Sequence, residues 1–285
     1  MGCCRAAPSV AYTEIVGICA EEEMPMQPDP VDLRAVVEGD GPWLLLLHGF
    51  SHDHRYWRWQ RGPLASSCRL VLADLRGHGG SPSPIDIAYG PVEHLVDVIR
   101  LLDRLGVASA HILGTHTGAG VGLLLALEHP DRVASLILEG AVIPGMPLAP
   151  NDAALIRMRE IARDRGVVAA RASWFEQPFF DGVRREANAA ELREIMDEFS
   201  GAPWRADAGQ SPVPPIVDRL GSLRQPVSLI NGADDLTEFL DTARQLEREL
   251  PHARRYLIPG AGAFPAWERP DAVTPLLLRI LEEHD

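Results

Sequence analysis

Short apolar runs alternate with helical patterns along most of this chain, and this alternation restricts the fold more than any other feature of the sequence. Runs typical of strands occur at about residues 31–37, 43–47, 69–73, 110–113, 135–138, 227–231 and 254–258. The run at 43–47 is apolar on both faces, as expected for a central strand of a parallel sheet. The alternation therefore predicts an α/β fold with a mostly parallel sheet flanked by helices.

The strand pattern stops between residues 144 and 215, where two amphipathic helical patterns replace it. Their apolar positions are Leu155, Ile156, Met158 and Ile161 in the first, and Leu192, Ile195, Met196 and Phe199 in the second. We expect residues 144–215 to form a helical lid inserted into one α/β core, which comprises residues 31–143 and 216–285. Residues 1–30 are expected to be a weakly specified amino-terminal extension.

Composition limits the classes of function. With 285 residues, 46% of them hydrophobic, the chain can bury one large core. Its formal net charge of -13 and the lack of a basic stripe argue against a nucleic-acid partner. All 27 basic side chains are arginine, which excludes Schiff-base and pyridoxal-phosphate chemistry on a lysine. We interpret the missing lysine as drift in a GC-rich bacterial genome.

The cysteines predict no disulfide framework and no metal site. Three of the four, Cys3, Cys4 and Cys19, are crowded near the amino terminus, and the fourth is Cys68. This spacing is typical of reduced thiols, so a cytoplasmic location is expected. No apolar stretch is long enough for a membrane span, and no membrane partner is expected.

Residues 114–118, Gly-Thr-His-Thr-Gly, follow an apolar run and lead into a helix start rich in small residues. This order predicts a strand, a sharp turn and a helix. Such a turn presents its central side chain to a cleft, and here that side chain is His116. The flanking side chains of Thr115 and Thr117 should point away from the cleft.

Six motifs together resemble the α/β-hydrolase fold family in their order along the chain, from about residue 31 to the end. They are Leu47-His48-Gly49-Phe50, Asp74-Leu75-Arg76-Gly77-His78-Gly79-Gly80-Ser81, the turn at 114–118, His129-Pro130-Asp131-Arg132-Val133, Asn231-Gly232-Ala233-Asp234-Asp235, and Gly262-Ala263-Phe264-Pro265-Ala266-Trp267-Glu268-Arg269-Pro270. One such motif is weak, but six in sequence are specific. His48 and His78 match positions at which the family's motifs brace turns.

The resemblance implies a catalytic triad of which only the acid is intact. His116 stands in the place of the nucleophile, Asp235 in that of the acid, and Ala263 in that of the basic histidine. Formation of an acyl-enzyme by the family's route is therefore excluded. The oxyanion hole depends only on backbone N–H groups, which the resemblance assigns to Phe50 and Thr117.

The absence of the nucleophile and the absence of the basic histidine are interpreted as one change, in which the base has moved to position 116. On this hypothesis Asp235 accepts a hydrogen bond from one ring nitrogen of His116, which fills the volume vacated at Ala263, while the other nitrogen faces substrate. Two alternatives stay open. His116 fills a pocket without chemistry, or Asp235 caps the helix that begins near Leu236.

The substrate pocket is expected to include Trp267, Phe264, Ala263, His52 and Glu139. Of these, Glu139 ends a strand and is a candidate second acid. His52 and His54 follow the oxyanion loop, but no third ligand with suitable spacing accompanies them, so no metal is expected.

A base beside an oxyanion hole suits proton abstraction next to a carbonyl. We expect a cofactor-free, lyase-like or cyclase-like enzyme that catalyses elimination, isomerisation, cyclisation or C–C cleavage of a small carbonyl metabolite, with specialised (secondary) metabolism as the associated pathway class. One alternative is a hydrolase of esters, lactones or epoxides that uses His116 or an activated water. Another is a protein that binds a small ligand without catalysis. The expected partner is a small-molecule substrate, and the sequence leaves a homodimer open.

Overall fold

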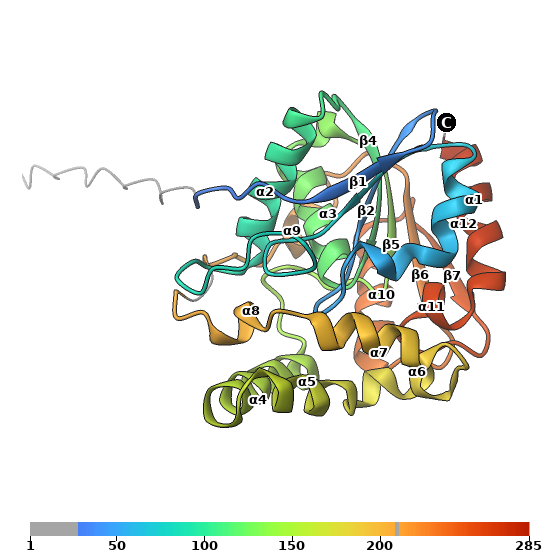
Figure 1. Ribbon diagram of the computed structural model, residues 1–285. Coiled ribbons are helices and arrows are strands. Elements are labelled where there is room, and N and C mark those ends of the chain that lie inside the picture. Colours follow the sequence, from blue (N-terminus) through green and yellow to red (C-terminus); the bar gives the residue numbers. More distant parts are fainter. Residues whose placement is uncertain (1–27, 209–210, 285) are drawn as a thin grey trace, which may run out of the picture.

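Seven strands form one mostly parallel sheet in the order β1-β3-β2-β4-β5-β6-β7. The computed structural model describes residues 28–208 and 211–284 (Figure 1). The strands are β1 (Ala35–Glu38), β2 (Trp43–Leu47), β3 (Arg69–Ala73), β4 (Ala110–Thr115), β5 (Val133–Glu139), β6 (Val227–Gly232) and β7 (Arg254–Ile258). Only β1 runs antiparallel to its neighbour, β3. The α/β fold and the mostly parallel sheet predicted from the sequence are confirmed.

Strand β2 shows why a purely apolar run becomes a central strand. Its side chains alternate between two separate hydrophobic cores, with Leu44 and Leu46 in one and Leu45 and Leu47 in the other. All four are fully buried, because helices cover both faces of the sheet. Each face therefore has a core of its own.

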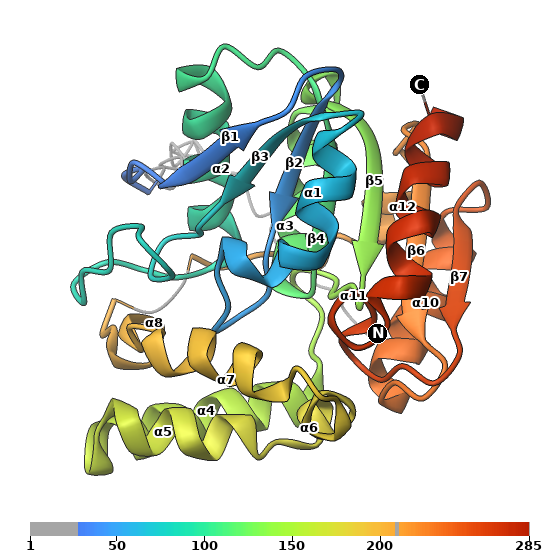
Figure 2. The ribbon, with the colours of Figure 1, turned by 45° about the vertical axis from the view of Figure 1, so that its right-hand side comes forward.

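Helices from the ends of the chain cover one face of the sheet, and helices from its middle cover the other (Figure 2). The first layer contains α1 (Arg58–Ala65), α11 (Pro265–Glu268) and α12 (Pro270–His284), and the second contains α2 (Pro91–Arg104), α3 (Thr117–Glu128), α9 (Val217–Leu220) and α10 (Thr237–Glu249). None of the described helices combines the length and apolarity that a membrane span requires.

Five α-helices of the segment between β5 and β6 lie over the carboxyl ends of the strands (Figures 1 and 2). They are α4 (Ala149–Arg165), α5 (Val167–Phe175), α6 (Asp181–Arg185), α7 (Ala189–Glu198) and α8 (Ala202–Arg205). The two helical patterns found in the sequence correspond to α4 and α7. The sequence pattern does not predict α5, because its residues are almost all apolar and show no helical period. We call α4–α8 the helical insertion, and its action as a lid stays a prediction.

The predicted amino-terminal extension lies outside the described residues, apart from residues 28–30.

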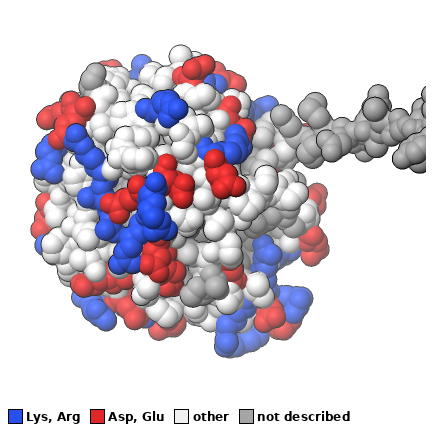
Figure 3. All heavy atoms as spheres, turned by 180° about the vertical axis from the view of Figure 1, so that it is seen from behind, with Lys and Arg blue, Asp and Glu red and all other residues white. Residues whose placement is uncertain are grey.

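Surface charge in the described part is mixed in sign. Figure 3 shows arginine and acidic side chains next to one another on one face, without a continuous basic field. Pairs such as Arg100 and Arg104 with Asp32, at 2.7 and 3.1 Å, illustrate this pairing.

A buried ion pair ties the loop after β3 to helix α2. The guanidinium of Arg76 donates two hydrogen bonds to the carboxylate of Asp97, at 2.5 and 2.7 Å, and neither side chain reaches the surface. Arg76 also donates to the carbonyl oxygen of Ala88 at 3.0 Å. The pair therefore positions the segment that leads into α2.

We predict that Arg76→Met destabilises the protein by about 3–5 kcal/mol, because the Asp97 carboxylate is left buried without its partner. The double variant Arg76→Met/Asp97→Leu should recover most of this loss. Urea unfolding measures both, with Arg104→Met in an exposed pair as the control, expected to change stability by less than about 1 kcal/mol. Equal losses in the control and in Arg76→Met would contradict the prediction.

Candidate active site

The turn between β4 and α3 holds a histidine in a strained conformation. His116 is the single residue between the two elements, with φ 46° and ψ -105°. A side chain in this region is costly, so the surroundings must enforce it. A Cβ atom at Gly118 would lie 2.2 Å from the carbonyl oxygen of Leu47, so only glycine allows this close approach. The predicted strand, sharp turn and helix are confirmed.

His116 lines a cavity of about 270 Å³ between the sheet and the helical insertion. Much of the wall is aromatic, and the rings come from both the core and the insertion. They include Phe50, Trp174, Phe180, Trp204, Phe239 and Phe264. The cavity suits a small ligand with a flat or apolar frame.

The two backbone groups assigned to the oxyanion hole border the same cavity. Phe50 and Thr117 both line it. Thr117 is the first residue of α3, so its N–H has no acceptor within the helix. Neither N–H donates to an acceptor in the part of the chain that the structure describes. Both groups are therefore free to stabilise a developing oxyanion.

The ring of His116 is held by a hydroxyl and by two phenyl rings. Its Nδ1 lies 2.9 Å from Oγ1 of Thr115, and its Nε2 is buried without a partner among the described residues. The rings of Phe239 and Phe264 have their centroids 5.0 and 4.8 Å from that of the imidazole. Burial lowers the pKa of His116 to about 4, so the ring is neutral at pH 7.

The predicted hydrogen bond between His116 and Asp235 is wrong. One carboxylate oxygen of Asp235 accepts from the backbone N–H of Leu236 at 2.8 Å, and the other accepts from the side-chain amide of Asn231 at 3.1 Å. These donors are close in sequence and occupy the carboxylate. Burial raises the pKa of Asp235 to about 6. The catalytic role of Asp235 stays a prediction, without the contact on which it was based.

A second buried carboxyl group lies on the strand next to the turn, and the backbone carbonyl of the same residue accepts the N–H of His116 at 2.9 Å. Glu139, the last residue of β5, is buried and accepts hydrogen bonds from the Tyr56 hydroxyl at 3.0 Å and from the Ala266 N–H at 2.6 Å. Burial raises the pKa of Glu139 to about 7, while hydrogen bonds from Ala266, Tyr56 and Thr115 oppose this rise. Thr115 is paired with Glu139 in the register of β4 and β5, and its hydroxyl lies 2.9 Å from the imidazole of His116.

The α/β-hydrolase fold family matches residues 42–270. The chain belongs to this family. A 2-succinyl-6-hydroxy-2,4-cyclohexadiene-1-carboxylate synthase from Enterobacter sp. is 28% identical over 247 residues, which are 84% of this chain and 92% of that protein. An epoxide hydrolase from Caballeronia sordidicola is 34% identical over 135 residues, 47% of this chain and 40% of that one.

The fold of a solved α/β hydrolase agrees with this assignment. An esterase from Thermogutta terrifontis superposes with a TM-score of 0.78 at 24% identity, covering 88% of this chain and 93% of that one. At this identity the likeness shows the fold alone. The named relatives catalyse more than one reaction, so family membership leaves the reaction of this chain to be argued from its own site.

Of the five residues expected in the substrate pocket, only Phe264 lines the cavity. Within the described chain, Trp267, His52 and Glu139 are buried behind the wall, and Ala263 borders a separate, smaller hollow. Glu268 fixes the loop by accepting hydrogen bonds from the N–H groups of Gly262 and Phe264. The loop held in this way brings Phe264, and not Ala263, to the ring of His116.

The sequence reading missed other residues of the site. Thr115 does not line the cavity, as the sequence predicts, but its hydroxyl lies 2.9 Å from Nδ1 of His116, a contact that the sequence does not predict. The sequence predicts a turn brace at His78 and indicates no role for His94, yet both line the cavity. The position of Glu139 at the end of the strand next to the turn is the signal that makes it a candidate acid in the sequence.

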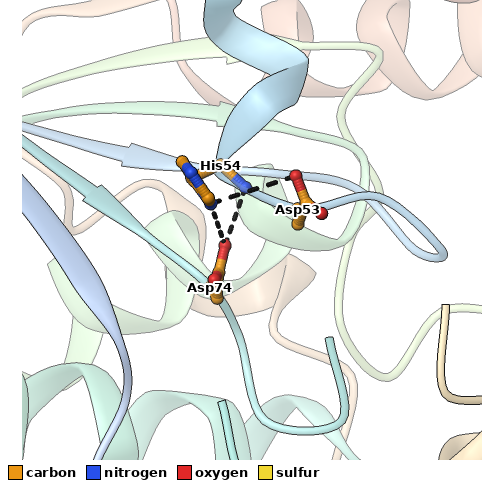
Figure 4. A group of neighbouring side chains, drawn as sticks. All are labelled: Asp53, His54 and Asp74. Atoms are coloured by element: carbon orange, nitrogen blue, oxygen red, sulfur yellow. Dashed lines mark hydrogen bonds and ion pairs between the residues drawn. The ribbon is translucent and has the colours of Figure 1, made fainter. Parts of the chain in front are cut away.

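Asp53, His54 and Asp74 form the cluster in the described chain whose geometry could suit a metal ion, with donor atoms within 4.8 Å of one another (Figure 4). Nδ1 of His54 lies 2.7 Å from Asp74, and the guanidinium of Arg34 lies 3.0 Å from the other oxygen of Asp74. Asp53 pairs with Arg55 at 2.7 Å. With arginine cations already on these carboxylates, the cluster is explained as a brace of the loop after β2.

We predict that Glu139→Gln changes the pH dependence of stability. The carboxyl group ionises near pH 4.5 when unfolded and near pH 7 when folded, so the folded state binds more protons between these values and wild-type stability falls as pH rises through them. Relative to the variant, the wild type should lose on the order of 3 kcal/mol between pH 4.5 and pH 8. Urea unfolding at several pH values measures this difference.

Tyr56→Phe serves as the matched comparison for this experiment. Its hydroxyl hydrogen bond lowers the pKa of Glu139, so removing it should shift the loss of stability to higher pH. If the difference in free energy of unfolding between wild type and Glu139→Gln does not change with pH, Glu139 has an ordinary pKa in the folded protein and is ionised there, and the prediction is wrong.

Proposed function

We propose that this protein is a cofactor-free enzyme in which His116 acts as a general base beside an oxyanion hole. The substrate is a small carbonyl compound that loses a proton next to its carbonyl group and then undergoes elimination, isomerisation, cyclisation or C–C cleavage. The observation that carries the proposal is the combination of a neutral imidazole and two free backbone N–H groups, of Phe50 and Thr117, on one aromatic cavity.

Thr115 and Glu139 determine which nitrogen is the base. When the Thr115 hydroxyl donates its proton to the Glu139 carboxylate, its oxygen accepts the N–H of His116 Nδ1 at 2.9 Å. The lone pair of the imidazole is then on Nε2, the nitrogen without a partner among the described residues. In this role Thr115 and Glu139 are positioning residues, and they replace the contact predicted for Asp235.

The ring must move before it can take a proton from substrate. Nε2 is shielded from water and lies so close to Gly140 that a Cβ atom there would be 2.8 Å away. Rotation of the His116 ring toward the cavity would expose Nε2 to a bound ligand. The hydrogen bond between Nδ1 and Thr115 would be kept during this rotation.

The low pKa of His116 narrows the substrate class. A base whose conjugate acid has a pKa of about 4 is weak, and proton transfer is efficient only when the pKa values of base and substrate are brought close. We therefore favour an acidic C–H, such as one between two carbonyl groups, whose enolate oxygen is stabilised by the N–H groups of Phe50 and Thr117.

Hydrogen exchange of ethyl 2-methylacetoacetate in D₂O, followed by NMR, tests the proposal without knowledge of the natural substrate. The wild type should accelerate exchange of the proton between the two carbonyl groups, and His116→Ala should reduce this acceleration by about 10²–10⁴-fold. Thr115→Val should lower it less, because the ring keeps its base but loses its orientation.

The same spectra distinguish the alternatives. Release of ethanol that depends on His116 would identify a hydrolase, in which the imidazole or an activated water attacks the ester. Equal exchange by the wild type and His116→Ala would remove the base from the mechanism. Binding of the compound without exchange or cleavage would favour a protein that holds a ligand without catalysis.

The pH profile of exchange provides a separate prediction. His116 must be neutral to act, and its pKa is lowered to about 4, so the steep acid limb of activity should lie near pH 4, while protonation of Glu139 near pH 7 should only weaken the orientation of the ring and lower activity by a smaller factor. A histidine with an ordinary pKa would lose activity near pH 6.5. The logarithm of the enzyme-dependent rate constant, plotted from pH 3.5 to 8, measures the position of this acid limb.

A further inference from the structure

We infer that the cavity contains a second polar subsite, formed by His78 and His94, that binds a neutral hydroxyl group of the substrate. The inference rests on the proposed function, because the subsite would hold another group of the same carbonyl compound. His78 follows β3 and His94 lies in α2, and both line the cavity that His116 lines. Their ring centroids are 6.4 Å apart.

The tautomer of His78 is fixed by its backbone partner. Its Nδ1 lies 2.8 Å from the carbonyl oxygen of Arg76, which can only accept a hydrogen bond, so Nδ1 carries the proton. Nε2 then has a lone pair, and it is buried without a partner among the described residues. The ring stacks on Phe199 at 4.8 Å and meets the edge of Phe50 at 5.6 Å, so it must turn within this aromatic packing to bring the buried Nε2 to a ligand.

His94 adds a second unpaired atom. The residue is 4% exposed, and its Nδ1 has no hydrogen-bond partner in the described chain. Burial lowers the pKa of His94 to about 3 and that of His78 well below its ordinary value, so both rings are neutral at pH 7. A carboxylate would find no positive charge on either ring.

The chemistry of the ligand group follows from these atoms. Nε2 of His78 can only accept, which excludes a carbonyl or carboxylate oxygen as its partner. A hydroxyl donates to Nε2 and can also donate to or accept from His94, whichever tautomer that ring has. Because Phe50 and Trp204 lie in the same wall, with ring centroids 5.8 Å apart, a phenolic hydroxyl on a flat frame suits the subsite.

Binding of 4-(4-hydroxyphenyl)butan-2-one tests the subsite, measured by calorimetry against its methyl ether. The wild type should bind the free phenol about ten-fold more tightly, because the ether cannot donate to Nε2. In His78→Phe, which keeps a ring against Phe199, this preference should fall to less than about two-fold. His116→Phe is the matched control and should keep the preference.

Three results would overturn the inference. The first is a wild type that binds phenol and ether equally, and the second is an undiminished preference in His78→Phe. The third is tighter binding of 4-(3-oxobutyl)benzoate, which places a carboxylate where the phenol would be. If thermal melting shows that His78→Phe does not fold, His94→Phe replaces it, and a preference unchanged in that variant would also count against the subsite.

This experiment separates the subsite from the reaction. It needs no turnover, so the phenol preference can be present even when His116→Ala leaves proton exchange unchanged. Conversely, loss of exchange in His116→Ala together with equal binding of phenol and ether would support the base and reject the subsite.

Discussion

The backbone turn at His116 is the constraint on which the rest of the site depends. Its positive φ must be enforced by contacts on both sides. On the side of β2, Gly118 allows the backbone of α3 to approach Leu47 closely. On the side of β5, the N–H of His116 donates to the carbonyl oxygen of Glu139 at 2.9 Å. The parallel register pairs Leu47 with Gly114 and Thr115 with Glu139. The carboxyl ends of β2, β4 and β5 therefore lie side by side. This brings together the oxyanion loop after β2, the start of α3 after β4 and the buried Glu139 at the end of β5.

Burial determines the protonation states around this turn. Desolvation disfavours every charged form, so it lowers the pKa of His116, His78 and His94 and raises that of Glu139. Next to the turn the cavity consequently presents neutral imidazoles and backbone dipoles to a ligand, while Asp152 and Arg159 of the helical insertion bring charged side chains to another part of its wall. The neutral imidazoles and dipoles interact best with neutral donors and with charge that develops during reaction.

Much of the fold could be predicted from the sequence, because apolar runs and turn residues are local signals. The strands at 43–47, 69–73 and 254–258 have the predicted bounds, and α5 was missed for lack of a helical period. The partners of side chains were harder to predict. Asp235 was assigned to His116 by family position, yet its carboxylate binds the donors nearest to it in sequence, a choice that depends on loop geometry and not on motif order.

The backbone around the turn does not depend on the side chain that the turn carries. The conformation at residue 116 is enforced by Gly114, Gly118 and the bond to Glu139, and none of these depends on which side chain the turn carries. The oxyanion donors are backbone groups and are equally independent of it. Histidine at this position removes the hydroxyl nucleophile of the family. It also places a ring nitrogen 2.9 Å from the hydroxyl of Thr115, the last residue of β4. In this structure the hydrogen-bond partner of the ring therefore comes from the strand that leads into the turn, and not from Asp235 in the loop after β6, whose carboxylate binds Asn231 and Leu236.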